Sequence, residues 1–224
     1  MGQGIVIIQL ACSILSGAII IGKAKELNRI IFNSRRFQRE FNAAGVDVLA
    51  YYLQRRKGGE TALDLVYTRT CERVVKLLGS ELRDKMIRER RGTPGEALTA
   101  REVELIRGTC EHTVQEEEIR ISHGMTGLAC IVTISPMLGL LGTVWGVLDA
   151  FDVMGAKGTV LLSEIAPAIS SALVTTVVGL LVAIPSAGCY NYLASRLRRI
   201  TTDMVGLADE LMGRIACEYQ GREI

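Results

Sequence analysis

Three long uncharged stretches limit the possible folds of this chain more than any other feature of its sequence. They cover residues 1–22, 124–148 and 165–195, and none contains Asp, Glu, Lys, Arg or His. A helix needs about 20 predominantly apolar residues to cross the hydrocarbon core of a membrane, so each stretch is long enough to span it. Nearly all charge lies between the stretches. This distribution excludes an ordinary soluble enzyme and predicts an all-α integral membrane protein with three transmembrane helices.

The first stretch is expected to be a retained anchor rather than a cleaved signal peptide. A signal peptide carries basic residues before its apolar run. Here no basic residue precedes the run, whereas Lys23 and Lys25 follow it. No small-residue cleavage site stands out either. We therefore expect residues 5–21 to stay in the membrane.

The placement of Lys and Arg predicts the orientation. Of 26 such residues, 20 lie in 23–123, five lie from Arg196 onward, and only Lys157 lies between the second and third stretches. Basic segments stay in the cytoplasm. The predicted order is a transmembrane helix with a short periplasmic N-terminus (1–22), a cytoplasmic helical domain (23–123), a transmembrane helix (124–151), a periplasmic loop (152–164), a transmembrane helix (165–195) and a cytoplasmic helical tail (196–224).

Local signals predict where helices begin and end inside the cytoplasmic domain. Glycines at 58–59 and a Gly-Thr-Pro-Gly run at 92–95 indicate breaks. Thr99 and Glu102 then form a capping box, and Leu98 and Val103 are placed to form its hydrophobic staple. A helix is therefore expected to begin at Ala100.

The second and third spans are both expected to extend into the cytoplasm as long helices. After Ala100 no proline occurs until Pro136, so the second span is predicted to be the upper half of one helix that ends near residue 151. Beyond Tyr192, apolar residues recur with a helical period through Ile215. That period predicts a similar extension of the third span.

Chemistry-bearing side chains form no recognisable catalytic site. The six cysteines show neither paired nor metal-binding spacing and are expected to stay reduced. No nucleophile, base or metal cluster is evident, so the sequence predicts neither an enzyme nor a cofactor. The net charge of +2 gives no indication of a nucleic-acid partner.

Two stripes of small residues mark the second and third spans. In each stripe the spacing i, i+4, i+7, i+11 places the residues on one helix face. The stripes consist of Gly139, Thr143, Gly146 and Ala150, and of Ala172, Thr176, Gly179 and Ala183, with Gly142 beside the first. Small residues let helices approach closely in lipid.

These stripes allow two interpretations. The simpler interpretation is packing of the second span against the third inside one subunit, which is common in membranes. The more specific interpretation is a polar seam or pore lined by hydroxyls, since the third span contains Ser170, Ser171, Thr175 and Thr176 close together. Because both stripes are not expected to be satisfied inside one three-helix subunit that also exposes hydroxyls to lipid, we predict a ring of subunits.

Two motifs in these spans resemble known signatures. The run 135–146, with Pro136 and Trp145, and the run 166–191, with Pro167 and Pro185, together cover about 60 residues in order. They resemble the second- and third-span signatures of the MotA/TolQ/ExbB proton-channel family. Three spans and a large insert after the first resemble its TolQ/ExbB branch. The insert itself shows no comparable motif.

This resemblance implies a bacterial inner-membrane homopentamer around a pore. The pore would hold a single-span partner of the TolR/ExbD type, and a TolA/TonB-like transducer would act further along. The family's conserved threonines fall on Thr143 and Thr176, with Thr175 and Ser171 as further candidate lining hydroxyls. Where the family commonly has Glu, this chain has Ser171. No acid occurs in 124–148 or 165–195, so the partner's Asp is expected to titrate.

Other functions stay open at this stage. A structural membrane scaffold would need the small stripes but not the two hydroxyls. A solute transporter would show internal repeats, which are not visible. The machine served, whether Tol-Pal, Ton-type uptake or gliding, is not indicated. Arg196, Arg198 and Arg199 follow the third span, either as a positive-inside anchor or as a site for anionic lipid.

Overall fold

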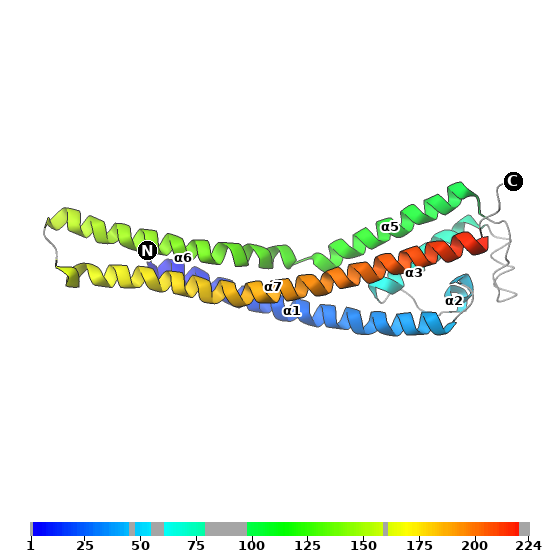
Figure 1. Ribbon diagram of the computed structural model, residues 1–224, viewed down its shortest axis with the longest axis horizontal. Coiled ribbons are helices and arrows are strands. Elements are labelled where there is room, and N and C mark those ends of the chain that lie inside the picture. Colours follow the sequence, from blue (N-terminus) through cyan, green and yellow to red (C-terminus); the bar gives the residue numbers. More distant parts are fainter. Residues whose placement is uncertain (1, 45–47, 55–60, 79–97, 159–160, 220–224) are drawn as a thin grey trace. The chain divides into compact units, whose positions relative to one another are not determined.

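The computed structural model describes residues 2–44, 48–54, 61–78, 98–158 and 161–219. The secondary-structure elements in these residues are all α-helices (Figure 1). The helices are α1 (Gly2–Ala44), α2 (Val48–Gln54), α3 (Ala62–Leu77), α5 (Ala100–Ser122), α6 (Met125–Lys157) and α7 (Leu162–Tyr219). The prediction of an all-α protein is confirmed.

Three of these helices, α1, α6 and α7, are long and apolar enough to cross a membrane. They contain the three uncharged stretches. The chain divides into two compact units. We call residues 1–25 and 123–195 the spanning unit, and residues 26–122 and 196–224 the insert unit.

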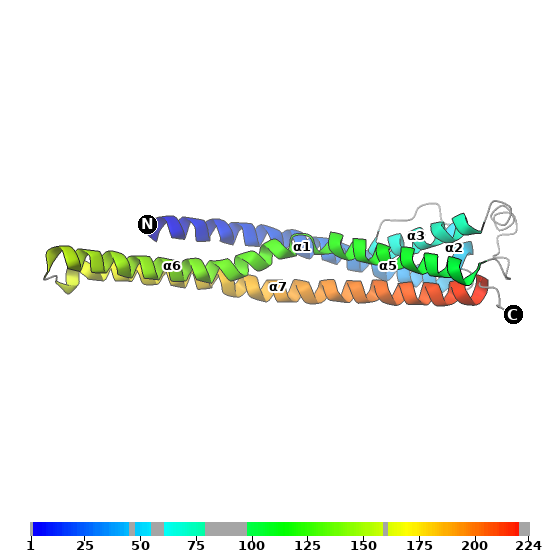
Figure 2. The ribbon, with the colours of Figure 1, turned by 90° about the horizontal axis from the view of Figure 1, so that it is seen from above.

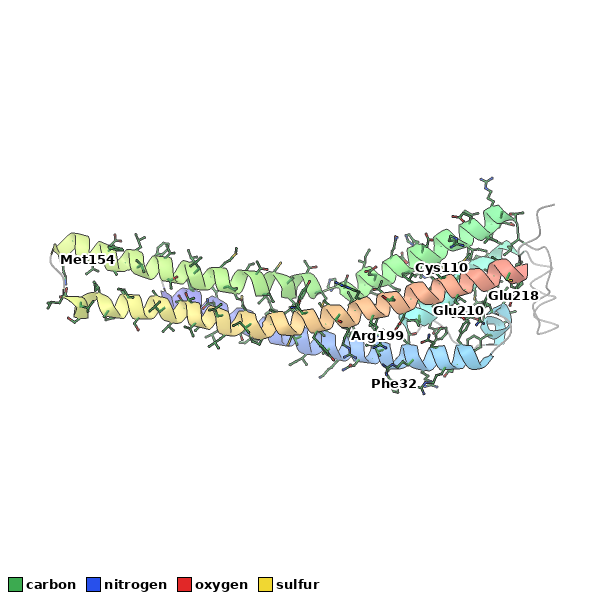
Figure 3. All side chains as sticks on the ribbon, in the orientation of Figure 1. Phe32, Cys110, Met154, Arg199, Glu210 and Glu218 are labelled. Atoms are coloured by element: carbon green, nitrogen blue, oxygen red, sulfur yellow. The ribbon has the colours of Figure 1, made fainter. Side chains whose placement is uncertain are left out.

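In the spanning unit, α6 lies alongside the first part of α7 in both views of the ribbon (Figures 1 and 2). Met154 lies close to the end of α6 (Figure 3). Lys157 Nζ of α6 and Glu164 Oε2 of α7 form an ion pair of 3.0 Å. These ends of the two helices are therefore joined by a contact between exposed side chains.

The insert unit has its own core. Phe37 and Phe41 of α1 stack with centroids 6.0 Å apart, and both rings contact Tyr67 of α3. The guanidinium of Arg214 in α7 lies 5.1 Å from the centroid of the Phe41 ring. The part of α7 in this unit buries Ile200, Met204, Leu207, Leu211 and Ile215. The predicted helical extension of the third span is therefore confirmed.

The predicted start of the helix at Ala100 is also confirmed. The backbone N–H of Thr99 donates to Glu102 Oε2 at 2.8 Å, and the Glu102 N–H donates to Thr99 Oγ1 at 3.3 Å. Leu98 and Val103 are both buried. Hydrogen bonds from the backbone N–H of Thr99 and, to a smaller extent, from its hydroxyl lower the pKa of Glu102. The breaks predicted at 58–59 and 92–95 fall outside the described residues.

The prediction of one unbroken helix from Ala100 through the second span is wrong. Helix α5 ends at Ser122 and α6 begins at Met125. Between them Gly124 has a φ of 86°, a left-handed conformation that ends a helix and that glycine adopts without steric cost. The second span and the helix before it are therefore separate elements.

Removing the cap at Thr99 should fray the start of α5. Thr99→Ala is expected to cost about 1 kcal/mol at the helix terminus, so amide hydrogen exchange at residues 100–103 should speed up severalfold. Thr109→Ala is the control, because that exposed hydroxyl bonds only to the Leu105 carbonyl of the same helix. The stabilisation that the Glu102 carboxylate gives to the helix start should be fully present above pH 4.5, the ordinary pKa of the group. It should be lost as the pH falls through the lowered pKa of Glu102 in the folded protein. Unchanged exchange in Thr99→Ala would contradict the cap.

Candidate functional site

Helices α6 and α7 approach each other closely along three glycines of α6. A Cβ added to Gly139 would lie 3.0 Å from Thr176 Cα. At Gly142 it would lie 2.6 Å from Thr175 Cβ, and at Gly146 it would lie 2.5 Å from Ala172 Cβ. Real Cβ atoms essentially never come as close to another heavy atom as at Gly142 and Gly146, and the 3.0 Å at Gly139 is tighter than nine in ten real Cβ contacts. Space rather than backbone conformation therefore favours glycine at these three contacts.

The small stripes are thus satisfied inside one subunit. Gly179 of α7 faces α6 in the same way, with the Ser135 carbonyl oxygen 2.7 Å from the position of a Cβ. Ala150, Ala172 and Ala183 are buried as well. The two stripes contact each other within one subunit, so the prediction of a ring needs support other than the stripes. The glycine contacts favour the packing interpretation of these residues.

Thr175 lies inside the helix crossing. Its side chain is 1% exposed, and its hydroxyl donates to the Ala172 carbonyl at 2.6 Å, with the Gly139 carbonyl 3.2 Å away. This differs from the prediction that Thr175 lines an ion path. The difference arises because the crossing brings Gly142, rather than open space, against that face of α7.

Thr176 and Thr143 lie at the edge of the same crossing and are only partly buried. Thr176 Oγ1 donates to the Gly139 carbonyl of α6 at 2.9 Å, and Thr143 Oγ1 donates to the Leu140 carbonyl at 2.7 Å. A hydroxyl has one proton and two lone pairs. Since both protons are engaged by carbonyls, each oxygen is left able to accept a hydrogen bond. Ser171 is exposed.

Acidic groups are confined to the ends of these spans. Asp149, Asp152 and Glu164 are exposed, and Glu164 pairs with Lys157. An acid inside a membrane is a proton-relay candidate by default, but the uncharged stretches offer none. The crossing supplies hydroxyl and carbonyl oxygens only, so it can stabilise a proton-carrying group but not replace one.

Sequence reasoning missed the contribution of α1 to this site. Gln9 is fully buried, and its side-chain Nε2 donates to the Thr175 carbonyl at 3.1 Å. The same nitrogen lies 2.9 Å from the position of a Cβ on Gly179. The available signal was an amide side chain inside the predicted span 5–21. It predicts a buried polar contact but does not indicate which helix receives it.

The remaining predicted residues are placed as follows. Pro136 lies within α6, and Pro167 and Pro185 lie within α7. Trp145 is partly buried. In the insert unit, Arg196 Nη1 donates to Asn28 Oδ1 at 2.6 Å, whereas Arg198 and Arg199 are exposed. Figure 3 marks Arg199 on α7.

Comparison with known proteins agrees with the motifs. A sequence model of the MotA/TolQ/ExbB proton channel family matches residues 78–205, which include α5, α6 and most of α7. "Tol-Pal system protein TolQ" of Haemophilus influenzae is 29% identical over 210 residues, covering 93% of this chain and 86% of that protein.

Two relatives named "Biopolymer transport protein ExbB" match over shorter segments. That of Neisseria gonorrhoeae is 40% identical over 96 residues, 43% of this chain and 44% of that protein. That of Salmonella typhimurium is 43% identical over 70 residues, 31% of this chain and 29% of that protein. The TolQ alignment covers nearly the whole chain, so the insert is related to TolQ by sequence, which motif inspection did not detect.

Proposed function

Because this chain belongs to the MotA/TolQ/ExbB proton channel family, we propose that it is the stator-type subunit of an inner-membrane motor driven by the proton-motive force. It couples proton flow to movement of a TolR/ExbD-like partner and so to work on the cell envelope. The family match over the two spans that form the crossing carries this conclusion. The family is a proton channel family rather than an enzyme family.

The crossing suggests how this chain takes part in proton transfer. The partner's transmembrane Asp carries the proton, because the uncharged stretches of this chain contain no acid. When that Asp is protonated, its O–H donates to a lone pair of Thr176 or Thr143. Each proton that crosses releases about 2.3 kcal/mol per 100 mV of membrane potential, which is several times the thermal energy. That energy biases the movement of the partner.

Reconstitution with the partner tests this function. The chain and a TolR/ExbD-like single-span protein of the same organism are placed in liposomes that contain a pH-sensitive dye, and a membrane potential is applied. Proton uptake is expected only when both proteins are present. Liposomes with this chain alone serve as the control. If the pair conducts no protons above that control, the stator function is refuted and the scaffold alternative gains support.

We infer from the positions of Lys and Arg that the end of α6 and the start of α7 face the periplasm and that the insert unit faces the cytoplasm. An impermeant thiol reagent added from the periplasmic side should label a cysteine at Ala156 and spare one at exposed Arg101. The exposed native Cys130 and Cys217 are replaced first. The reverse pattern would overturn the orientation. In this topology Arg198 and Arg199 act as the positive-inside anchor.

Membership of the TolQ/ExbB branch supports a pentamer around a pore. The exposed apolar residues of α6 and α7 offer surface for neighbouring copies; they include Met137, Leu140, Val144, Val177, Leu181 and Ile184. Native mass spectrometry in mild detergent should show five copies of the chain. A stable monomer as the main species at all protein concentrations would contradict the ring.

A further inference from the structure

In the spanning unit, α1 turns its polar residues inward. The buried residues among the described part of α1 here are Gln9, Ser16 and Lys23, spaced seven apart on one face. Large aliphatic side chains of the same segment are exposed, among them Ile7, Ile8, Leu10, Ile14, Leu15 and Ile21. Polar groups within membrane helices face protein or water-filled space rather than lipid. This side of α1 therefore forms a polar seam against α7.

Two polar contacts connect the seam to α7. Ser186 Oγ donates to Ser16 Oγ at 3.2 Å, and Ser16 Oγ donates to the Ser13 carbonyl at 3.0 Å. About two helical turns before Ser16 in the sequence, Gln9 Nε2 donates to the Thr175 carbonyl. A carbonyl oxygen can only accept, so this contact fixes which end of the amide faces α7. The Gln9 Oε1 atom is thereby directed elsewhere.

Gln9 Oε1 and Ser135 Oγ are both buried and without a hydrogen-bond partner. Gln9 and Ser135 each have 0% exposure. The two residues meet beside Gly179: the Gln9 Nε2 and the Ser135 carbonyl oxygen lie 2.9 and 2.7 Å from the position that a Cβ of Gly179 would take. The two residues that carry the orphaned atoms therefore lie next to each other at the junction of α1, α6 and α7.

We propose that Gln9 Oε1 and Ser135 Oγ hold a buried water molecule beside Gly179, and that this water hydrates the candidate ion path at Thr176. A buried polar atom without a partner is costly, and internal waters typically satisfy such groups. The water donates to the Gln9 oxygen and either accepts from or donates to the serine hydroxyl. Another chain cannot fill the site, because both residues are fully buried in this subunit. The link to the ion path rests on the proposed function.

A double-mutant cycle on the purified protein tests the water without any assay of function. Ser135→Ala removes one partner of the water, and Gln9→Met removes the other at similar size. A shared water predicts that Ser135→Ala lowers the melting temperature, and that Gln9→Met lowers it less in the Ser135→Ala background than in the native chain. Ser170→Ala is the control, because that serine is exposed; its melting temperature should not change.

The stability of the Ser135→Ala variant can also contradict the proposed water. If the site is dry, Ser135→Ala replaces an orphaned polar group by an apolar one and should raise the melting temperature. Either that rise or strictly additive effects would overturn the water. Should Gln9→Met fail to assemble, the direction of the Ser135→Ala shift alone decides the matter.

Proton flux in liposomes that contain the partner tests the link to the ion path. Ser135→Ala is expected to lower partner-dependent flux severalfold at a temperature where the variant is fully folded. Native flux combined with a lowered melting temperature would keep the water but overturn its role in the path. If the native pair conducts no protons, the proposed function and the link to the path both fail, while the stability cycle still reports on the water itself.

Discussion

Replacing Gly142 by alanine is expected to disrupt the spanning unit more than any other single methyl addition on α6. The new Cβ would lie 2.1 Å from Thr175 Oγ1 and 2.6 Å from Thr175 Cβ. Thr175 is buried and stiff at χ1, so rotation cannot relieve the overlap and the two helices must separate. Overpacking of this kind costs about 1–3 kcal/mol or more. A lower melting temperature in detergent and a lower yield of folded protein should result.

Matched variants separate this overlap from a general effect of alanine. Gly155 also lies in α6, but a Cβ there would meet no atom within 4 Å. Gly155→Ala should therefore be neutral or mildly stabilising, since alanine favours a helix over glycine by about 1 kcal/mol. Thr175→Ala should rescue Gly142→Ala only in part, because the Cβ overlap persists, and Thr175→Gly should rescue it further. Equal stability of Gly142→Ala and Gly155→Ala would show that the helices are not this close.

The spans and the cap were predictable because each depends on local sequence. An uncharged run of 22 residues or more can satisfy its backbone in lipid only as a helix. The capping box needs only Thr99 and Glu102. The break at Gly124 was not predictable, because glycine is also common within transmembrane helices. The left-handed φ of Gly124 distinguishes a helix end from a packing glycine, and that angle is not readable from residue type.

The site was predictable as a pair of stripes but not in its detail. Thr175 and Thr176 are adjacent hydroxyls, about 100° apart around α7. Periodicity places either one on a small-residue face. The rotation of α7 against α6 decides that Thr175 is buried at Gly142 and Thr176 lies at the edge. That rotation depends on glycine contacts and on Gln9 of α1, which lies more than 160 residues away in sequence. Long-range contacts of this kind leave no local pattern.

Thr176→Val is expected to slow coupled proton flux strongly while the complex still assembles. Valine keeps the shape of threonine and removes the hydroxyl, whereas Thr176→Ser keeps the hydroxyl and removes a methyl. In the valine variant the Gly139 carbonyl loses the Thr176 donor, but Thr175 Oγ1 remains 3.2 Å from it. Assembly should therefore survive. Without the Thr176 hydroxyl, the O–H of the protonated Asp has no acceptor at this position, and a buried donor left unsatisfied costs about 1–3 kcal/mol. If that interaction stabilises the transfer step, its loss should slow flux about five- to a hundredfold.

A hydroxyl elsewhere in the same span provides the control for this result. Thr133 of α6 is exposed and donates only to the Ala129 carbonyl of its own helix at 3.0 Å. Thr133→Val removes the same group from the same kind of helix, so flux should stay at the native level. Partner-dependent flux measured in parallel for Thr176→Val, Thr176→Ser and Thr133→Val then separates chemistry from packing. Equal flux in the valine and serine variants of Thr176 would assign this position to packing, because in that case the shape of the side chain rather than its hydroxyl would be what the motor requires.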